Sequence, residues 1–151
     1  MIQRIGITLL LGLLFFAPLP ASAAERGTAE EAQALVEKAI ARYKEVGAEQ
    51  TFAEIDTPGG SFVDRDLYVF VVGPDKRTVA HGVDQTLIGD LMVGSKDYRG
   101  KPFGDEILAA TPEGFWVDYH FKNYVTGKNE QKSSFVRKVG DYIFGCGYYK
   151  P

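Results

Sequence analysis

The chain has 151 residues, with 17 Lys and Arg against 20 Asp and Glu and a formal net charge of −3. These charges are interspersed along the sequence, so we expect no nucleic-acid-binding surface. Because Cys146 is the only cysteine, no internal disulfide bond can form, and the fold must depend on packing alone.

The N-terminal segment has the pattern of a secretory signal peptide. Arg4 is its only charge, Ile5 to Phe16 is apolar, and Ala21-Ser22-Ala23 has the small-x-small form of a cleavage site. An uncleaved membrane anchor is the alternative, but a span needs about 20 apolar residues and this run is shorter. We therefore expect a signal peptide at residues 1–23, export to a bacterial periplasm, and one domain at residues 24–151.

Two helices are predicted at the start of that domain. Thr28 and Glu31 form a capping-box pattern, and apolar residues then recur at helical spacing from Ala32 to Tyr43. This periodicity predicts a helix of four or more turns with one buried stripe. Gly47 ends the helix, and Glu49 to Ile55 form a second, short helix.

A β-hairpin follows. Its first strand, Leu67 to Val72, is apolar on both faces, which indicates a sheet covered on both sides. Gly73-Pro74-Asp75 supplies the turn, and the return strand Thr78 to Ala80 delivers His81 beside an aromatic wall.

The second half predicts an antiparallel meander. Val83 to Gly100 lacks a sustained period and is expected to be irregular, and Lys101 to Ala110 resemble a short helix. Strands are predicted at Phe115 to Phe121, Ser133 to Val139 and Tyr142 to Tyr149. Together these elements indicate an α+β fold with helix on one face of the sheet and loops on the other.

Several segments, in this order and spacing, resemble a known family. They are DRDLYVFVV, AHGVDQTLIG, DYRGKPFGDEI, GFWVDYHF, VTGK and KSSFVRKVGDYIFGCGYY. The chain resembles the single-Cache extracellular sensor domains of bacterial chemoreceptors and histidine kinases. The resemblance implies a PAS-like five-stranded antiparallel sheet behind a long N-terminal helix, with a small-molecule pocket under covering loops. Such domains usually lie between two transmembrane helices; since this chain ends at Pro151, we expect a standalone secreted member.

Two polar residues are candidate contacts for a ligand. A neutral His81 can donate to a carboxylate, although a structural histidine is the alternative. Lys132 is expected at the exposed start of a strand, opposite the strand that carries Tyr119. An ordinary solvated lysine is the alternative, and the resemblance implies that this cation pairs with a ligand carboxylate. The predicted ligand-binding residues are Tyr68, His81, Trp116, Tyr119, Lys132 and Tyr148.

Gly145 and Gly147 remove two side chains from one face of the last strand. Such a gap indicates either close approach by a ligand or another backbone, or tight helix packing. Phe135 and Tyr124 depart from the family pattern, which commonly has Tyr and Pro at these positions, and this departure bears on which ligand is bound.

The expected function is therefore binding and sensing of a small organic ligand, an organic acid by preference, for signal transduction or chemotaxis. The expected partner is a membrane histidine kinase or chemoreceptor. No cofactor, metal or catalytic residue is expected, since metal and nucleotide motifs are missing from the sequence. One alternative is an accessory protein that docks on a membrane receptor without its own ligand. Another is a hydrolase with Cys146 as nucleophile, which a continuous apolar strand around the thiol does not favour.

Overall fold

The computed structural model describes residues 25–151, and the predicted signal peptide at residues 1–23 lies outside the described residues. Helix α1 (Ala29–Val46) begins with the predicted capping box: Thr28 accepts from the Glu31 N–H, and Glu31 accepts from the Thr28 N–H. Gly47, with φ of +83°, separates α1 from α2 (Ala48–Ile55). Within the described part of the chain, no helix is both long and apolar enough to cross a membrane.

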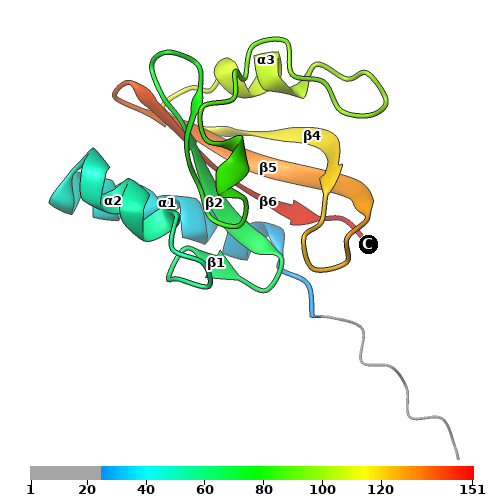
Figure 1. Ribbon diagram of the computed structural model, residues 1–151, viewed down its shortest axis with the longest axis horizontal. Coiled ribbons are helices and arrows are strands. Elements are labelled where there is room, and N and C mark those ends of the chain that lie inside the picture. Colours follow the sequence, from blue (N-terminus) through cyan, green and yellow to red (C-terminus); the bar gives the residue numbers. More distant parts are fainter. Residues whose placement is uncertain (1–24) are drawn as a thin grey trace, which may run out of the picture.

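Six antiparallel strands form the sheet. Their order is β1-β2-β6-β5-β4, and β3 also pairs with β2 (Figure 1). The resemblance implied five strands; the sixth is β1, a two-residue strand. The strands are β1 (Val63–Asp64), β2 (Leu67–Val72), β3 (Thr78–His81), β4 (Phe115–Lys122), β5 (Asn129–Val139) and β6 (Tyr142–Tyr149).

Residues 83–108 form the covering segment, which lies on one face of the sheet while α1 and α2 lie on the other (Figure 1). The covering segment contains the 3-10 helix η1 (Gln85–Leu87) and helix α3 (Phe103–Leu108). This layering confirms the predicted α+β fold with helix on one side and loops on the other.

The double-sided burial of β2 is confirmed. All six of its residues are buried. Val69 and Val71 pack with Val36 of α1 in one core cluster, whereas Phe70 and Val72 pack in a second cluster under the covering segment. Alternation along one strand therefore divides the molecule into a helix-side core and a loop-side core.

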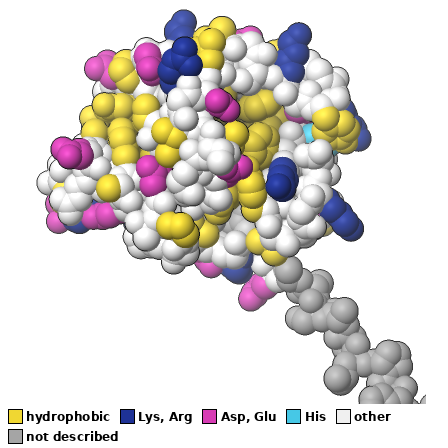
Figure 2. Space-filling view, in the orientation of Figure 1, with side chains coloured by type: hydrophobic (Ala, Val, Ile, Leu, Met, Phe, Trp, Pro, Cys, Tyr) yellow, Lys and Arg dark blue, Asp and Glu magenta, His cyan; other side chains and the backbone are white. Residues whose placement is uncertain are grey.

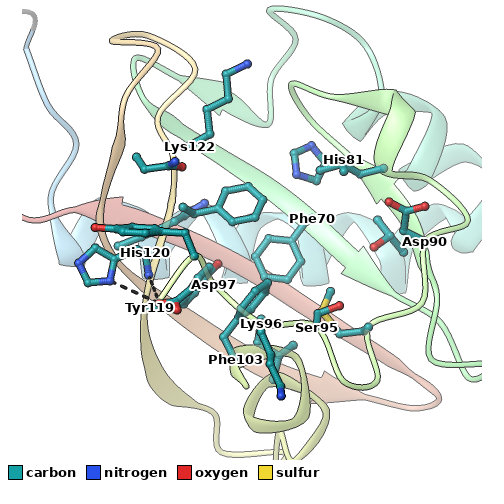
Figure 3. A pocket seen from close by; sticks show the side chains of 18 of the residues that line it. Phe70, His81, Asp90, Ser95, Lys96, Asp97, Phe103, Tyr119, His120 and Lys122 are labelled. Carbon is teal, nitrogen blue, oxygen red and sulfur yellow. Dashed lines mark hydrogen bonds and ion pairs between the residues drawn. The ribbon is translucent and has the colours of Figure 1, made fainter. Parts of the chain in front are cut away.

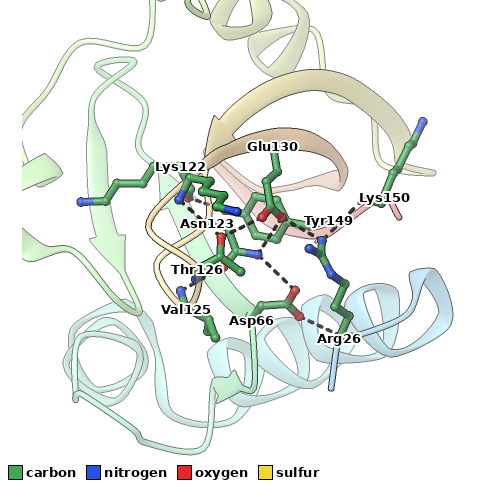
Figure 4. Close-up of polar contacts among 11 residues, drawn as sticks. Arg26, Asp66, Lys122, Asn123, Val125, Thr126, Glu130, Tyr149 and Lys150 are labelled. Carbon is green, nitrogen blue, oxygen red and sulfur yellow. Dashed lines mark hydrogen bonds and ion pairs between the residues drawn. The ribbon is translucent and has the colours of Figure 1, made fainter. Parts of the chain in front are cut away.

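A network of polar contacts ties the start of α1 to the β4–β5 connection (Figure 4). Arg26 pairs with Glu130 at 2.8 Å, and the Gly27 N–H donates to Asp66 at 2.7 Å. The buried Asn123 donates to both acids, at 3.4 Å to Asp66 and 3.1 Å to Glu130. Because these residues are far apart in sequence, the network fixes three chain segments against one another.

Candidate functional site

A cavity of about 390 Å³ lies between the loop-side face of the sheet and the covering segment. Residues from β2, β3, β4, β5, α3 and the loops line it (Figure 3). In the space-filling view, a band of apolar side chains is visible below α3 (Figure 2). The lining residues include Tyr68, Phe70, Thr78, His81, Asp90, Met92, Ser95, Lys96, Asp97, Phe103, Ile107, Tyr119, Phe121, Lys122 and Lys132.

Four of the six residues predicted from the sequence line this cavity, and two do not. Trp116 and Tyr148 pack against each other on the helix-side face, with ring centroids 5.7 Å apart. Their expected position is therefore wrong. Neighbouring residues on a strand face opposite sides of the sheet. Val117 faces the cavity side, so Trp116 faces the helix side. The four that share the cavity are Tyr68, His81, Tyr119 and Lys132.

Lys132 is buried within β5, with a relative exposure of 1%. The prediction that Lys132 lies at the start of a strand is wrong, because β5 begins three residues earlier, at Asn129. Its ammonium group donates to the Tyr68 hydroxyl at 2.8 Å and lies 4.0 Å from the centre of the Tyr68 ring. The rings of Tyr149 and Phe121 are 5.1 and 5.4 Å away.

Among residues 25–151, no carboxylate forms an ion pair with Lys132. Burial lowers the pKa of this amine to about 7, because desolvation disfavours the charged form. Hydroxyl and π-face contacts offset part of that cost. The result is a buried amine, about half charged at pH 7, that lines a cavity and lacks a paired anion.

Gly145 and Gly147 lie on the cavity face of β6. A side chain at Gly145 would collide with the ring of Phe70, and one at Gly147 would collide with Lys132 and Ser134. The gap therefore holds side chains of the cavity wall. Tight helix packing at these glycines, one of the two predicted explanations, is wrong, since α1 packs on the opposite face.

His81 is a buried, neutral donor at the end of β3. Its Nδ1 accepts from the Asp84 backbone N–H at 3.0 Å, so the ring proton is on Nε2. Burial, followed by the charge of Lys132, lowers the pKa of His81 to about 3. The imidazole lies 4.8 Å from the Tyr68 ring, between centroids, and lines the same cavity.

The covering segment is held to β4 by Asp97. This carboxylate accepts from the backbone N–H groups of Arg99 and Lys101, at 2.9 and 3.0 Å, and from that of His120, at 3.0 Å; Figure 3 shows the contact with His120. These hydrogen bonds, led by that of His120, lower the pKa of Asp97 to about 2. No sequence pattern identified Asp97, because its role depends on two segments that meet only in the fold.

The hydroxyl groups of Tyr68 and Tyr149 connect the cavity to the polar network around Asn123. The hydroxyls of Tyr68 and Tyr149 are 3.5 Å apart, and Tyr149 donates to the Lys122 carbonyl at 2.6 Å (Figure 4). Lys122 directly precedes Asn123, the centre of that network. Burial raises the pKa of both Tyr68 and Tyr149, so both remain neutral donors.

Cys146 lies in the helix-side core and is fully buried. Burial raises the pKa of its thiol to about 12, so the thiolate needed by a nucleophile is scarce at neutral pH. Within the described residues, no three His, Cys, Asp or Glu side chains are placed to hold a metal ion. The cavity is lined by Lys132, His81 and Tyr68, whose polar groups can donate hydrogen bonds and pair with charge.

Three solved structures share this fold. A methyl-accepting chemotaxis protein from Vibrio parahaemolyticus is 14% identical, with a TM-score of 0.68, covering 80% of this chain and 86% of that one. A periplasmic sensor domain of a chemotaxis protein is 23% identical, with a TM-score of 0.59 and coverages of 81% and 90%. A Cache chemosensory domain studied for carboxylic acid recognition is 19% identical, with a TM-score of 0.64 and coverages of 81% and 92%.

No curated protein sequence matches the chain at a significant level. The family model described as Single Cache domain 2 matches residues 21–149, which is most of the chain and includes every residue of the cavity. The sequence-based resemblance to single-Cache sensors is thereby confirmed. The chain belongs to the Single Cache domain 2 family.

Proposed function

We propose that this protein is a periplasmic sensor domain that binds a small organic monocarboxylate in the cavity, without turning it over. The observation that carries the proposal is the buried ammonium group of Lys132, which lines the cavity and has no carboxylate partner among residues 25–151. An unpaired buried charge is costly, and an anionic ligand removes that cost by pairing with it.

Three donors serve one anion in this proposal. Lys132 supplies the charge, His81 supplies its Nε2–H, and Tyr68 supplies a hydroxyl within reach of Lys132. Hydrogen bonds to a charged acceptor are about twice as strong as neutral ones, so this set favours a carboxylate over an uncharged ligand. The structural neighbour studied for carboxylic acid recognition supports the same ligand class.

The proposed partner is a membrane chemoreceptor or histidine kinase, and the proposed location is the periplasm. Two of the structural neighbours are domains of chemotaxis proteins, one of them described as a periplasmic sensor domain. An enzymatic role has little support, because Cys146 is buried away from the cavity.

An accessory role without a ligand would be favoured if Phe135 and Tyr124 marked a pocket that no longer binds one. Phe135 packs against Trp116 in the helix-side core, with ring centroids 5.4 Å apart, so its missing hydroxyl removes nothing from the cavity. Tyr124 donates to Asp84 at 2.8 Å and packs edge-on against Tyr68. The donors of the cavity are therefore intact, and this favours the ligand-binding role over the accessory one.

Calorimetric titration with acetate, propionate, butyrate and phenylacetate tests the proposal. Lys132→Gln should weaken acid binding by roughly 2 to 4 kcal/mol, because the anion is left unpaired in a buried site. Lys96→Gln is the matched control, since Lys96 also lines the cavity but has an exposed side chain. Equal affinities for the wild type and Lys132→Gln, or no heat with any acid, would contradict it.

A further inference from the structure

An aromatic wall forms one side of the cavity. The rings of Phe103 and Tyr119 are stacked, with centroids 4.5 Å apart and planes 6° apart. Phe121 lies edge-on to both, at 6.1 and 5.9 Å. The Tyr119 hydroxyl is 2.9 Å from the Ser134 hydroxyl of the neighbouring strand, so its polar atom is already hydrogen-bonded. The wall therefore offers a ligand aromatic surface and no free polar group.

This wall adjoins the buried amine. The Lys132 ammonium group lies 5.4 Å from the centre of the Phe121 ring. Phe70 pairs with His81 across β2 and β3, and its ring lies over Gly145 while Lys132 lies over Gly147, two residues further along β6. A carboxylate that reaches Lys132 thus places its next carbon atoms against Phe70 and Phe121.

Among the described residues that line the cavity, no buried side chain is free to pair with a second charge on the ligand. The other lysines of the lining, Lys96 and Lys122, are exposed, and in Figure 3 their ammonium groups point away from the cavity. Of the lining acids, Asp97 is occupied by its three backbone donors and Asp90 is exposed. A second carboxylate or an ammonium group on the ligand would be desolvated without compensation.

We infer, on the basis of the proposed carboxylate-binding function, that the preferred ligand is a monocarboxylate with an aromatic or branched apolar tail. The carboxylate pairs with Lys132 and the tail packs on Phe70, Phe103 and Phe121. A cavity of about 390 Å³ is within the range of pockets that enclose small organic ligands, and it leaves room beyond the carboxylate of acetate. Acetate, dicarboxylates and amino acids are expected to bind less tightly.

An affinity series on the purified protein tests this preference. Acetate, propionate, butyrate, benzoate and phenylacetate are titrated at one pH and ionic strength. Succinate, which carries a second carboxylate, and phenylalanine, which carries an ammonium group beside its carboxylate, are the probes with a second charge. Each added methylene should tighten binding by about three- to fourfold. Phenylacetate should bind at least tenfold more tightly than acetate, and more tightly than succinate or phenylalanine.

Substitution of the wall gives a second readout. Phe103→Ala should weaken phenylacetate binding by tenfold or more while acetate binding changes little, and Phe121→Leu should act in the same direction if Phe103→Ala folds poorly. Trp116→Ala is the control, because this aromatic ring lies on the opposite face of β4. Acetate or succinate binding as tightly as phenylacetate would overturn the apolar-tail inference and leave the carboxylate proposal intact. Binding of no acid at all would overturn both.

Discussion

The side chain of Lys132 lies over Gly147, in the space that a methyl group at position 147 would occupy. Gly147 is paired with Ser134 in the neighbouring strand β5. Because glycine has no side chain, the Lys132 side chain can cross β6 at this position. Glycine weakens a central strand, so its presence here has a local cause. That cause is the buried course of the lysine side chain toward Tyr68.

Gly147→Ala should therefore displace Lys132. The new Cβ would collide with the Lys132 chain and the Ser134 hydroxyl, and overpacking of a core costs about 1 to 3 kcal/mol. Urea denaturation should show this loss, and titration with butyrate should show weaker binding. Gly145→Ala is the comparison, because it collides with Phe70 and leaves the lysine chain untouched. Unchanged stability and affinity in Gly147→Ala would show that the lysine has another course.

Lys132 should make the unliganded protein more stable as the pH rises from 7 to 9. The pKa of this amine is about 7 in the fold and near 10.4 in the unfolded chain, so in this window the unfolded state binds the extra proton. Stability then increases with pH, by on the order of 2 kcal/mol over these two pH units. Contrary to the expectation for an exposed lysine, its replacement should therefore be visible in the folding free energy.

Lys132→Met should remove this pH dependence. Urea denaturation at pH 7, 8 and 9 gives the slope for each protein, and Lys138→Met is the control because Lys138 is exposed on the same strand. Burial raises the pKa of Cys146, which opposes this trend above about pH 8, where the unfolded thiol begins to ionise; both proteins share that contribution, so the difference between their slopes reports Lys132. Parallel stability profiles for the wild type and Lys132→Met would mean that the buried amine titrates normally.

His81 should contribute to acid sensitivity. Its pKa is about 3 in the fold and near 6.5 unfolded, so stability present above pH 6.5 is lost as the pH falls toward 3. Between pH 6.5 and 4.5 the loss should be about 2 kcal/mol. In His81→Asn, the amide oxygen can accept from Asp84 in place of Nδ1, and this part of the loss should disappear. An acid limb identical to that of the wild type would count against a buried neutral imidazole.

Carboxylate binding should take up a proton. Lys132 is largely neutral at pH 8 without ligand, and a bound anion favours its charged form. Butyrate titrated in buffers of different ionisation enthalpy should show uptake approaching one proton per ligand, with affinity falling up to about tenfold per pH unit above 7. Lys132→Arg keeps its charge at every pH tested, so it should show neither effect. Proton release, or a pH-independent affinity in the wild type, would contradict charge pairing at Lys132.

Asn123 should be a stability determinant at the base of the domain. It is buried, donates to Asp66 and Glu130, and accepts from the backbone N–H of Val125 (Figure 4). Asn123→Ala leaves these groups short of partners and should cost about 1 to 3 kcal/mol in urea denaturation. The exposed Asn129→Ala should change stability by no more than about 0.5 kcal/mol. Equal stability of the two variants would show that the network contributes little.

Local patterns were enough to predict most of the secondary structure. The capping box at Thr28 and Glu31 depends only on residues three apart, and the two-sided burial of β2 follows from an apolar run that alternation divides between two faces. Alternation along β4 also places Trp116 and Tyr119 on opposite faces of the sheet. The sequence alone was therefore enough to predict that Trp116 does not line the same cavity as Tyr119.

The sequence by itself thus determined the element types, the two covered faces of the sheet and the family, because these depend on short-range spacing and on motifs in a fixed order. Only the tertiary structure decided that Lys132 is buried without a carboxylate partner, that it crosses β6 over Gly147, and that Asp97 holds the covering segment to β4. The physical reason is that burial, pKa and hydrogen-bond partners depend on which distant segments pack together. Register and packing set those contacts, and a lysine in a polar stretch of sequence gives no local sign of either.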